Sequence, residues 1–238
     1  MFKRRFAYSA ALVMAILGVA LMATATPAQA DVFNLTSCHI STGCPAPGTV
    51  FGTVTLTTAG TGVTVDVALL NGNTFVETGS GGGALFAFLD SLAGSTVQNV
   101  TTTQDGNTVV VIPSGVSGST NLAPFMADGT GFFTAGIFCT VSSECNGGDT
   151  PDFNDLHFTV TNATIAQLTA TPNAEGNIFV ADILCGAAQT GCAGFTGPVD
   201  VSTPGVVPEP TTLLLVGTAL AGLGGAWRRS RSQRALAV

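Results

Sequence analysis

No lysine or arginine occurs between Asp31 and Pro208 of this 238-residue chain. All seven basic residues lie near the two ends, and of the fourteen acidic residues only Glu209 lies outside the central stretch. Proteins that bind nucleic acids neutralise phosphates with lysine and arginine, so this composition excludes a nucleic-acid partner. Anionic ligands are disfavoured for the same reason, unless a divalent cation bridges them.

The central region also lacks tryptophan and tyrosine, because Tyr8 and Trp227 are the only ones in the chain. Sugar-binding grooves usually stack such rings on pyranose faces, which weakens a lectin interpretation. The only histidines are His39 and His157, and no G-x-S-x-G motif is present. We therefore predict a protein that is not an enzyme and interpret His157 as an ordinary residue. A carboxylate pair for glycoside hydrolysis stays open, since such pairs are assembled in space.

The N-terminus has the pattern of a secretory signal peptide. Lys3, Arg4 and Arg5 precede an apolar run over residues 6–25, and Ala28 and Ala30 form an A-x-A cleavage site. This order of charge, apolar run and small residues is typical of a signal peptidase substrate. We predict a signal peptide over residues 1–30 that signal peptidase removes. An uncleaved membrane anchor is the alternative.

A second apolar segment, residues 211–227, lies near the C-terminus and contains no charged residue. As a helix it would be about 25 Å long, close to the lower limit for crossing a bilayer. Four arginines follow it and should stay in the cytoplasm by the positive-inside rule. We predict a transmembrane helix whose stop-transfer residues are Arg228, Arg229, Arg231 and Arg234.

Pro208, Glu209 and Pro210 directly precede this segment. A Pro-Glu-Pro motif, a short hydrophobic helix and an arginine-rich end, in this order, resemble the PEP-CTERM sorting signal over residues 208–234. The resemblance implies recognition by an exosortase, a membrane-anchored precursor, and delivery to the cell surface or the extracellular space. It also implies an association with exopolysaccharide or biofilm, and it covers only the C-terminal part of the chain.

The cysteines fall into three couples that are close in sequence. An even number behind a signal peptide indicates disulfides formed in an oxidising compartment. We predict three bonds, and the alternative of a thiolate metal site is poor because no C-x-x-C spacing occurs. The predicted pairs are Cys38–Cys44, Cys139–Cys145 and Cys185–Cys192.

The region between the ends, residues 31–198, has the texture of a β protein. Threonine, valine and phenylalanine alternate between turns rich in glycine and asparagine. We predict a mainly β fold, a single β-sandwich or jelly-roll-like domain, with residues 199–207 as a linker; a parallel β-helix is the rival. Strands are expected at 50–58, 63–70, 74–78, 97–103, 108–112, 131–140, 156–161 and 178–184, and short helices at 84–92 and 164–169.

One segment could bind a cation. Asp149, Asp152, Asn154 and Asp155 offer oxygens of the kind that Ca²⁺ prefers, although their spacing differs from that of an EF-hand. A solvated loop with turn-forming residues is the alternative. Calcium is the only cofactor that the sequence suggests. Three functions therefore stay open, in order of preference: a non-catalytic surface or matrix protein, a module that binds carbohydrate or calcium, and a hydrolase that acts on glycans.

Overall fold

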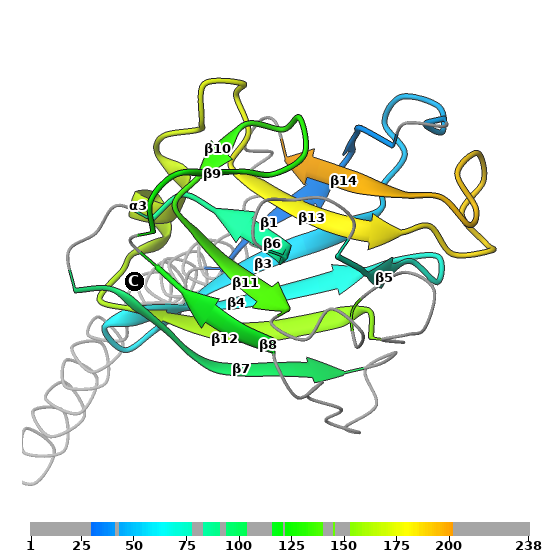
Figure 1. The fold of residues 1–238 in the computed structure, drawn as a ribbon. Coiled ribbons are helices and arrows are strands. Elements are labelled where there is room, and N and C mark those ends of the chain that lie inside the picture. The colour runs from blue at the N-terminus through cyan, green and yellow to red at the C-terminus, as the bar shows by residue number, and fades with distance from the viewer. Residues whose placement is uncertain are drawn as a thin grey trace, which may run out of the picture.

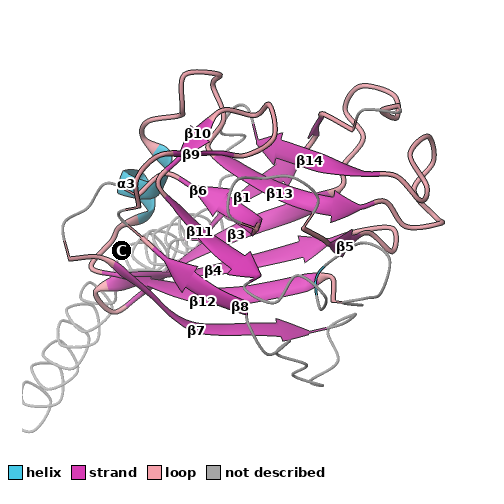
Figure 2. Ribbon diagram, in the orientation of Figure 1, coloured by secondary structure: helices cyan, strands magenta, loops and turns pink. Residues whose placement is uncertain are grey.

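A computed structural model describes residues 30–40, 43–77, 83–90, 94–103, 116–120, 122–139, 145 and 153–201. Within these ranges nearly all of the regular secondary structure is β-strand (Figure 2), which confirms the prediction of a mainly β fold. Every strand pair that the structure describes is antiparallel, and this overturns the parallel β-helix alternative.

The first sheet, sheet A, contains five strands in the described part of the chain, in the order β1-β3-β4-β12-β7. Its strands alternate between buried valine, leucine or phenylalanine and partly exposed threonine, which is the pattern of a sheet with one face on the core. The turn between β3 and β4 falls at Gly60 and Thr61, between the strands predicted at 50–58 and 63–70. The strands are β1 (Ala30–Leu35), β3 (Gly52–Ala59), β4 (Gly62–Leu69), β7 (Thr96–Thr103) and β12 (Asp155–Thr161).

The second sheet, sheet B, has the order β2-β14-β13-β6-β11-β8 among the described residues, and β5 pairs with β13 beyond the end of β6. Its middle strands carry long apolar runs because both of their faces are covered. The strands are β2 (Ser37–Cys38), β5 (Thr74–Phe75), β6 (Ala84–Phe88), β8 (Val116–Ser119), β11 (Ala135–Cys139), β13 (Phe179–Leu184) and β14 (Thr196–Val201).

The two sheets enclose one hydrophobic core, with β7 and β12 along the lower side of Figure 1 and β13 and β14 toward its top. Phenylalanine rings from opposite sheets meet in this core. Phe158 of sheet A lies 5.7 Å from Phe88 and 6.0 Å from Phe86 of sheet B, measured between ring centroids. Such pairs add to the free energy gained by burying the rings, so they hold the sheets face to face.

A smaller apolar cluster covers the outer face of sheet B. The hairpin of β9 (Phe125–Met126) and β10 (Phe132–Phe133) places Phe133 over Ala87 and Val180. The helix α3 (Ile165–Thr169) follows β12, and its N-cap Thr164 forms a capping box with Gln167. This helix confirms the prediction for residues 164–169.

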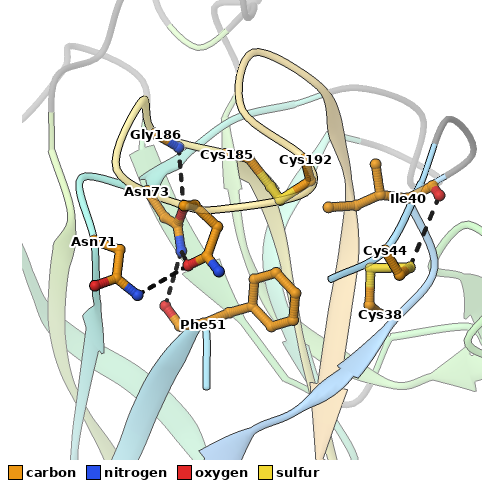
Figure 3. Close-up of a disulfide and its surroundings, with 10 residues drawn as sticks. Cys38, Ile40, Cys44, Phe51, Asn71, Asn73, Cys185, Gly186 and Cys192 are labelled. Atoms are coloured by element: carbon orange, nitrogen blue, oxygen red, sulfur yellow. Dashed lines mark hydrogen bonds between the residues drawn. A yellow bond between two sulfur atoms is a disulfide. The ribbon is translucent and has the colours of Figure 1, made fainter. Parts of the chain in front are cut away.

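All three predicted disulfides are present, and the described chain has no free cysteine. Cys38–Cys44 and Cys185–Cys192 close two loops at the same end of the domain (Figure 3). The backbones of these loops come close together, because a side chain at Gly191 would lie 3.0 Å from the Cα of Pro45. The two disulfides therefore constrain both loops where their backbones pack together, and the glycine at position 191 allows this close approach.

Two expectations were wrong. Residues 84–88 of the predicted helix 84–92 form the strand β6, because all five side chains are buried and the strand lies between β13 and β11. An apolar run that fits a helix also fits a central strand, and here tertiary pairing decides. The linker cannot start at residue 199, since β14 continues to Val201 and buries both Val199 and Val201 in the core.

Candidate functional site

A buried amide network supports the end of the domain that carries two disulfides (Figure 3). The side-chain amide of Asn73 donates to the Phe51 carbonyl at 3.1 Å and to Gln189 Oε1 at 3.2 Å, and its oxygen accepts from the Gly186 N–H at 3.0 Å. Asn71 donates to the same Gln189 oxygen at 3.0 Å. Because Asn73 and Gln189 are buried and satisfied, this network holds the loop in place.

The first of two histidine–aspartate pairs joins β14 to the residue that follows β2. His39 Nε2 lies 2.7 Å from Asp200 Oδ2; the imidazole is 38% exposed, whereas the carboxylate is completely buried. Despite this short distance, neither Asp200 oxygen has a hydrogen bond of good geometry to a described residue. Burial raises the pKa of the Asp200 carboxyl, and the neighbouring His39 and Ser37 lower it without reversing the shift.

Ser37, His39 and Asp200 do not form a catalytic triad. The Ser37 hydroxyl lies 3.2 Å from Nε2 of His39, the same nitrogen that faces Asp200. A triad needs one imidazole nitrogen for the nucleophile and the other for the carboxylate. This pair therefore fastens the short strand β2 to β14, where Ser37 and Asp200 are directly opposite each other.

The second histidine–aspartate pair lies on the outer face of sheet A. His157 Nδ1 is 2.6 Å from Asp66 Oδ1, and the two side chains are 38% and 41% exposed. Asp66 and His157 are directly opposite each other on neighbouring strands β4 and β12. The alternation of valine, leucine and phenylalanine on these strands predicts that both residues point away from the core, but it does not predict their pairing.

Threonines on the neighbouring strands lie directly opposite the two members of this pair. The row through Asp66 and His157 continues to Thr55 on β3 and to Thr101 on β7. Residues directly opposite each other in antiparallel strands share a face of the sheet. We call this surface the threonine face; it consists of Thr53, Thr55, Thr57, Thr64, Asp66, Thr101, Thr103, Asp155, His157 and Thr159, all of which are partly exposed.

A β-bulge in β7 completes the threonine face. The register shifts between His157 and Thr159, so that β7 has one extra residue there, and Asn99 adopts a φ of 54°. The extra residue exchanges the two faces of the strand beyond it. Val100 and Thr102 consequently face the core side, whereas Thr101 and Thr103 join the outer face beside His157 and Asp155.

The hydroxyl of Thr103 lies between the carboxylate of Asp155 and the imidazole of His157. It donates to Asp155 Oδ2 at 3.2 Å and lies 3.4 Å from His157 Nε2. The order carboxylate, imidazole, hydroxyl is that of a triad. The hydroxyl, however, has a single proton and donates it to Asp155, so it does not donate to the imidazole as a nucleophile would. The cluster also lies on a partly exposed sheet face. Its geometry suits hydrogen bonding to a ligand better than activation of a nucleophile.

Only part of the predicted calcium segment lies within the described residues. Asp155 begins β12 and accepts from Thr103, and Asn154 is buried with its carbonyl accepting from the Leu69 N–H at 2.8 Å. Asp149 and Asp152 lie outside the described residues. Within the ranges that the structure describes, no three histidine, cysteine, aspartate or glutamate residues are grouped to hold a metal ion.

The predicted processing sites lie almost wholly outside the described residues. Ala30 is the first residue of β1 and pairs with Thr57, whereas Ala28, the Pro208–Pro210 motif, the segment 211–227 and the four arginines are not described. In the described ranges, no helix has the length and hydropathy needed to span a membrane. Cleavage at Ala30 and the membrane helix stay predictions.

Residues 206–230 match the family model described as a PEP-CTERM protein-sorting motif. The chain therefore carries this sorting signal, as its C-terminal residues predicted, and the motif indicates an exported protein that an exosortase processes. The match begins beyond β14, the last strand among the described residues, and does not include the described domain. No curated protein and no solved structure matches the chain.

Proposed function

We propose that this protein is a non-catalytic component of the cell surface or the extracellular matrix, delivered through the exosortase route and associated with exopolysaccharide or biofilm. The observation that carries the proposal is the sorting motif at residues 206–230, placed directly after a folded domain. The three disulfides support an extracytoplasmic destination, because such bonds persist in oxidising compartments.

The domain would act as a compact β-sandwich module. Two antiparallel sheets around one core, short loops held by disulfides and a satisfied amide network give a rigid body that tolerates exposure outside the cell. Neither imidazole among the described residues has the arrangement that a nucleophilic mechanism requires. A surface role is therefore favoured over an enzymatic one.

The route can be tested by changing the motif. Replacing Pro208 and Pro210 with alanine should abolish processing, because the segment preceding the membrane helix would lose its recognised shape. Pro204→Ala is the matched control, since Pro204 lies outside the matched residues. Immunoblots of membrane, surface and medium fractions, in cells with and without an exosortase, measure the outcome. Equal processing of all variants, or processing without the exosortase, would contradict the proposal.

A module that binds carbohydrate or calcium is the second candidate, and the acceptor-rich threonine face favours its carbohydrate form. For calcium, calorimetric titration of the exported protein is the direct test. An unchanged melting temperature and no heat on addition of Ca²⁺ would reject a site that includes Asp155.

A further inference from the structure

We propose that the threonine face of sheet A is a binding surface for a neutral, hydroxyl-rich polysaccharide. The inference rests on the proposed function, which it extends by naming the surface and the chemical class of the partner. Its centre is the cluster of Asp66, His157, Asp155 and Thr103, joined by contacts of 2.6 Å, 3.2 Å and 3.4 Å.

Hydrogen-bond complementarity identifies the ligand class. The carboxylates of Asp66 and Asp155 only accept hydrogen bonds when ionised, and threonine hydroxyls can both donate and accept. A ligand that suits this face must therefore donate hydrogen bonds to the carboxylates and exchange hydrogen bonds with the threonines. Sugar hydroxyls can do both. Since no lysine or arginine occurs between Asp31 and Pro208, the face has no cation to neutralise phosphate, sulfate or uronate groups.

Shape supports an extended polymer. Neighbouring strands lie ~4.8 Å apart, so the three gaps between β3, β4, β12 and β7, the strands that carry the face, make it about 14 Å wide. The hydroxyls recur in rows across it, for example Thr57, Thr64 and Thr159, which are directly opposite one another. A chain lying across the strands would meet several of these groups at once, whereas a single sugar would contact few.

The face is also partly preorganised. Asp66 and Thr103 hold His157 from both ring nitrogens, and the bulge at Asn99 places Thr101 and Thr103 beside it. Groups that are held in place before binding lose less conformational entropy when a ligand arrives. Of the large exposed apolar residues, Met126, Phe132 and Phe195 lie outside sheet A and Leu70 lies just beyond the end of β4, so an apolar partner such as a lipid surface fits the face poorly.

Affinity electrophoresis of the exported protein tests the proposal. The gels contain one of three neutral polysaccharides (dextran, galactomannan or mixed-linkage β-glucan), or anionic alginate, or no polymer. We expect at least one neutral polymer to retard the protein, and alginate to leave it unretarded. The variant Thr53→Val/Thr55→Val/Thr57→Val should bind at least about eightfold more weakly, since each lost hydrogen bond weakens binding about two- to tenfold.

The matched control is Thr171→Val/Thr190→Val/Thr196→Val, which removes three hydroxyls away from the face and should bind as the unaltered protein does. A second variant, Asp66→Asn/His157→Gln, should weaken binding while its melting temperature shows that the domain is folded. No retardation by any neutral polymer, equal loss in the control, or retardation that requires added Ca²⁺ would each overturn the proposal. Export and processing are measured in a separate experiment, so a failure of the binding test would leave the proposed sorting route unaffected.

Discussion

The two histidine–aspartate pairs of this domain have similar geometry and opposite environments. The distances are 2.7 Å and 2.6 Å, and both imidazoles are 38% exposed. The carboxylates differ: Asp200 is completely buried, whereas Asp66 is 41% exposed. A buried carboxylate has lost its water and depends on its partner, while an exposed one is solvated and screened. The first pair therefore bears on stability, and the second is free to meet a ligand.

The largest expected effect comes from removing the imidazoles one at a time. His39→Ala should lower the free energy of unfolding by about 2 kcal/mol, because it leaves Asp200 buried without its ion-pair partner. His157→Ala should cost no more than about 0.5 kcal/mol, as expected for an exposed pair. Urea unfolding of both variants at pH 6 measures the difference. Equal costs would show that carboxylate burial does not separate the pairs.

A substitution at the β-bulge should have an intermediate effect on stability. It should disturb the surroundings of the Asp66–His157 pair and leave those of the His39–Asp200 pair unchanged. Asn99→Val should lower the free energy of unfolding by about 1 kcal/mol, since a β-branched residue is strained at a φ of 54°. Asn99→Gly is the matched control and should be nearly neutral. Thermal unfolding and gel retardation by the binding polysaccharide are the two measurements. If Asn99→Val left both the thermal unfolding and the gel retardation unchanged, the bulge would not be needed for stability or for binding.

The smallest effect concerns the charge of Asp200. Because burial raises its pKa, the folded state binds this proton more tightly than the unfolded state does, and stability falls as pH rises from the unfolded value near 3.8 to the raised folded value. Asp200→Asn should remove this slope and raise the free energy of unfolding at pH 7, because the variant no longer buries an ionised carboxylate.

Asp66→Asn provides the comparison for that experiment and should leave the curve of stability against pH almost unchanged. Urea unfolding at intervals between pH 4 and pH 8 gives both curves. A variant Asp200→Asn that keeps the slope of the unaltered protein would show that another group causes it. A large loss of stability at pH 7 would show that the ionised carboxylate stabilises the fold.

The amino-acid sequence by itself determined the features that depend on neighbours along the chain. The cysteine couples are six or seven residues apart, so each could close only a local loop, and all three bonds are present. The turn at Gly60, the capped helix after Thr164 and the sorting motif are also local. The absence of lysine and arginine between Asp31 and Pro208 already excluded a nucleic-acid partner before any fold was known.

Tertiary structure decided the features that depend on residues far apart in the chain. Burial on both faces made residues 84–88 a strand, and pairing with β13 extended β14 to Val201. The bulge at Asn99 reversed which residues of β7 face outward, so simple alternation could not place Thr101 and Thr103. Asp66 and His157 are 91 residues apart, and only the register of β4 against β12 brings them together. Alternation gives the face of a strand, but the partner strand decides which side chains meet.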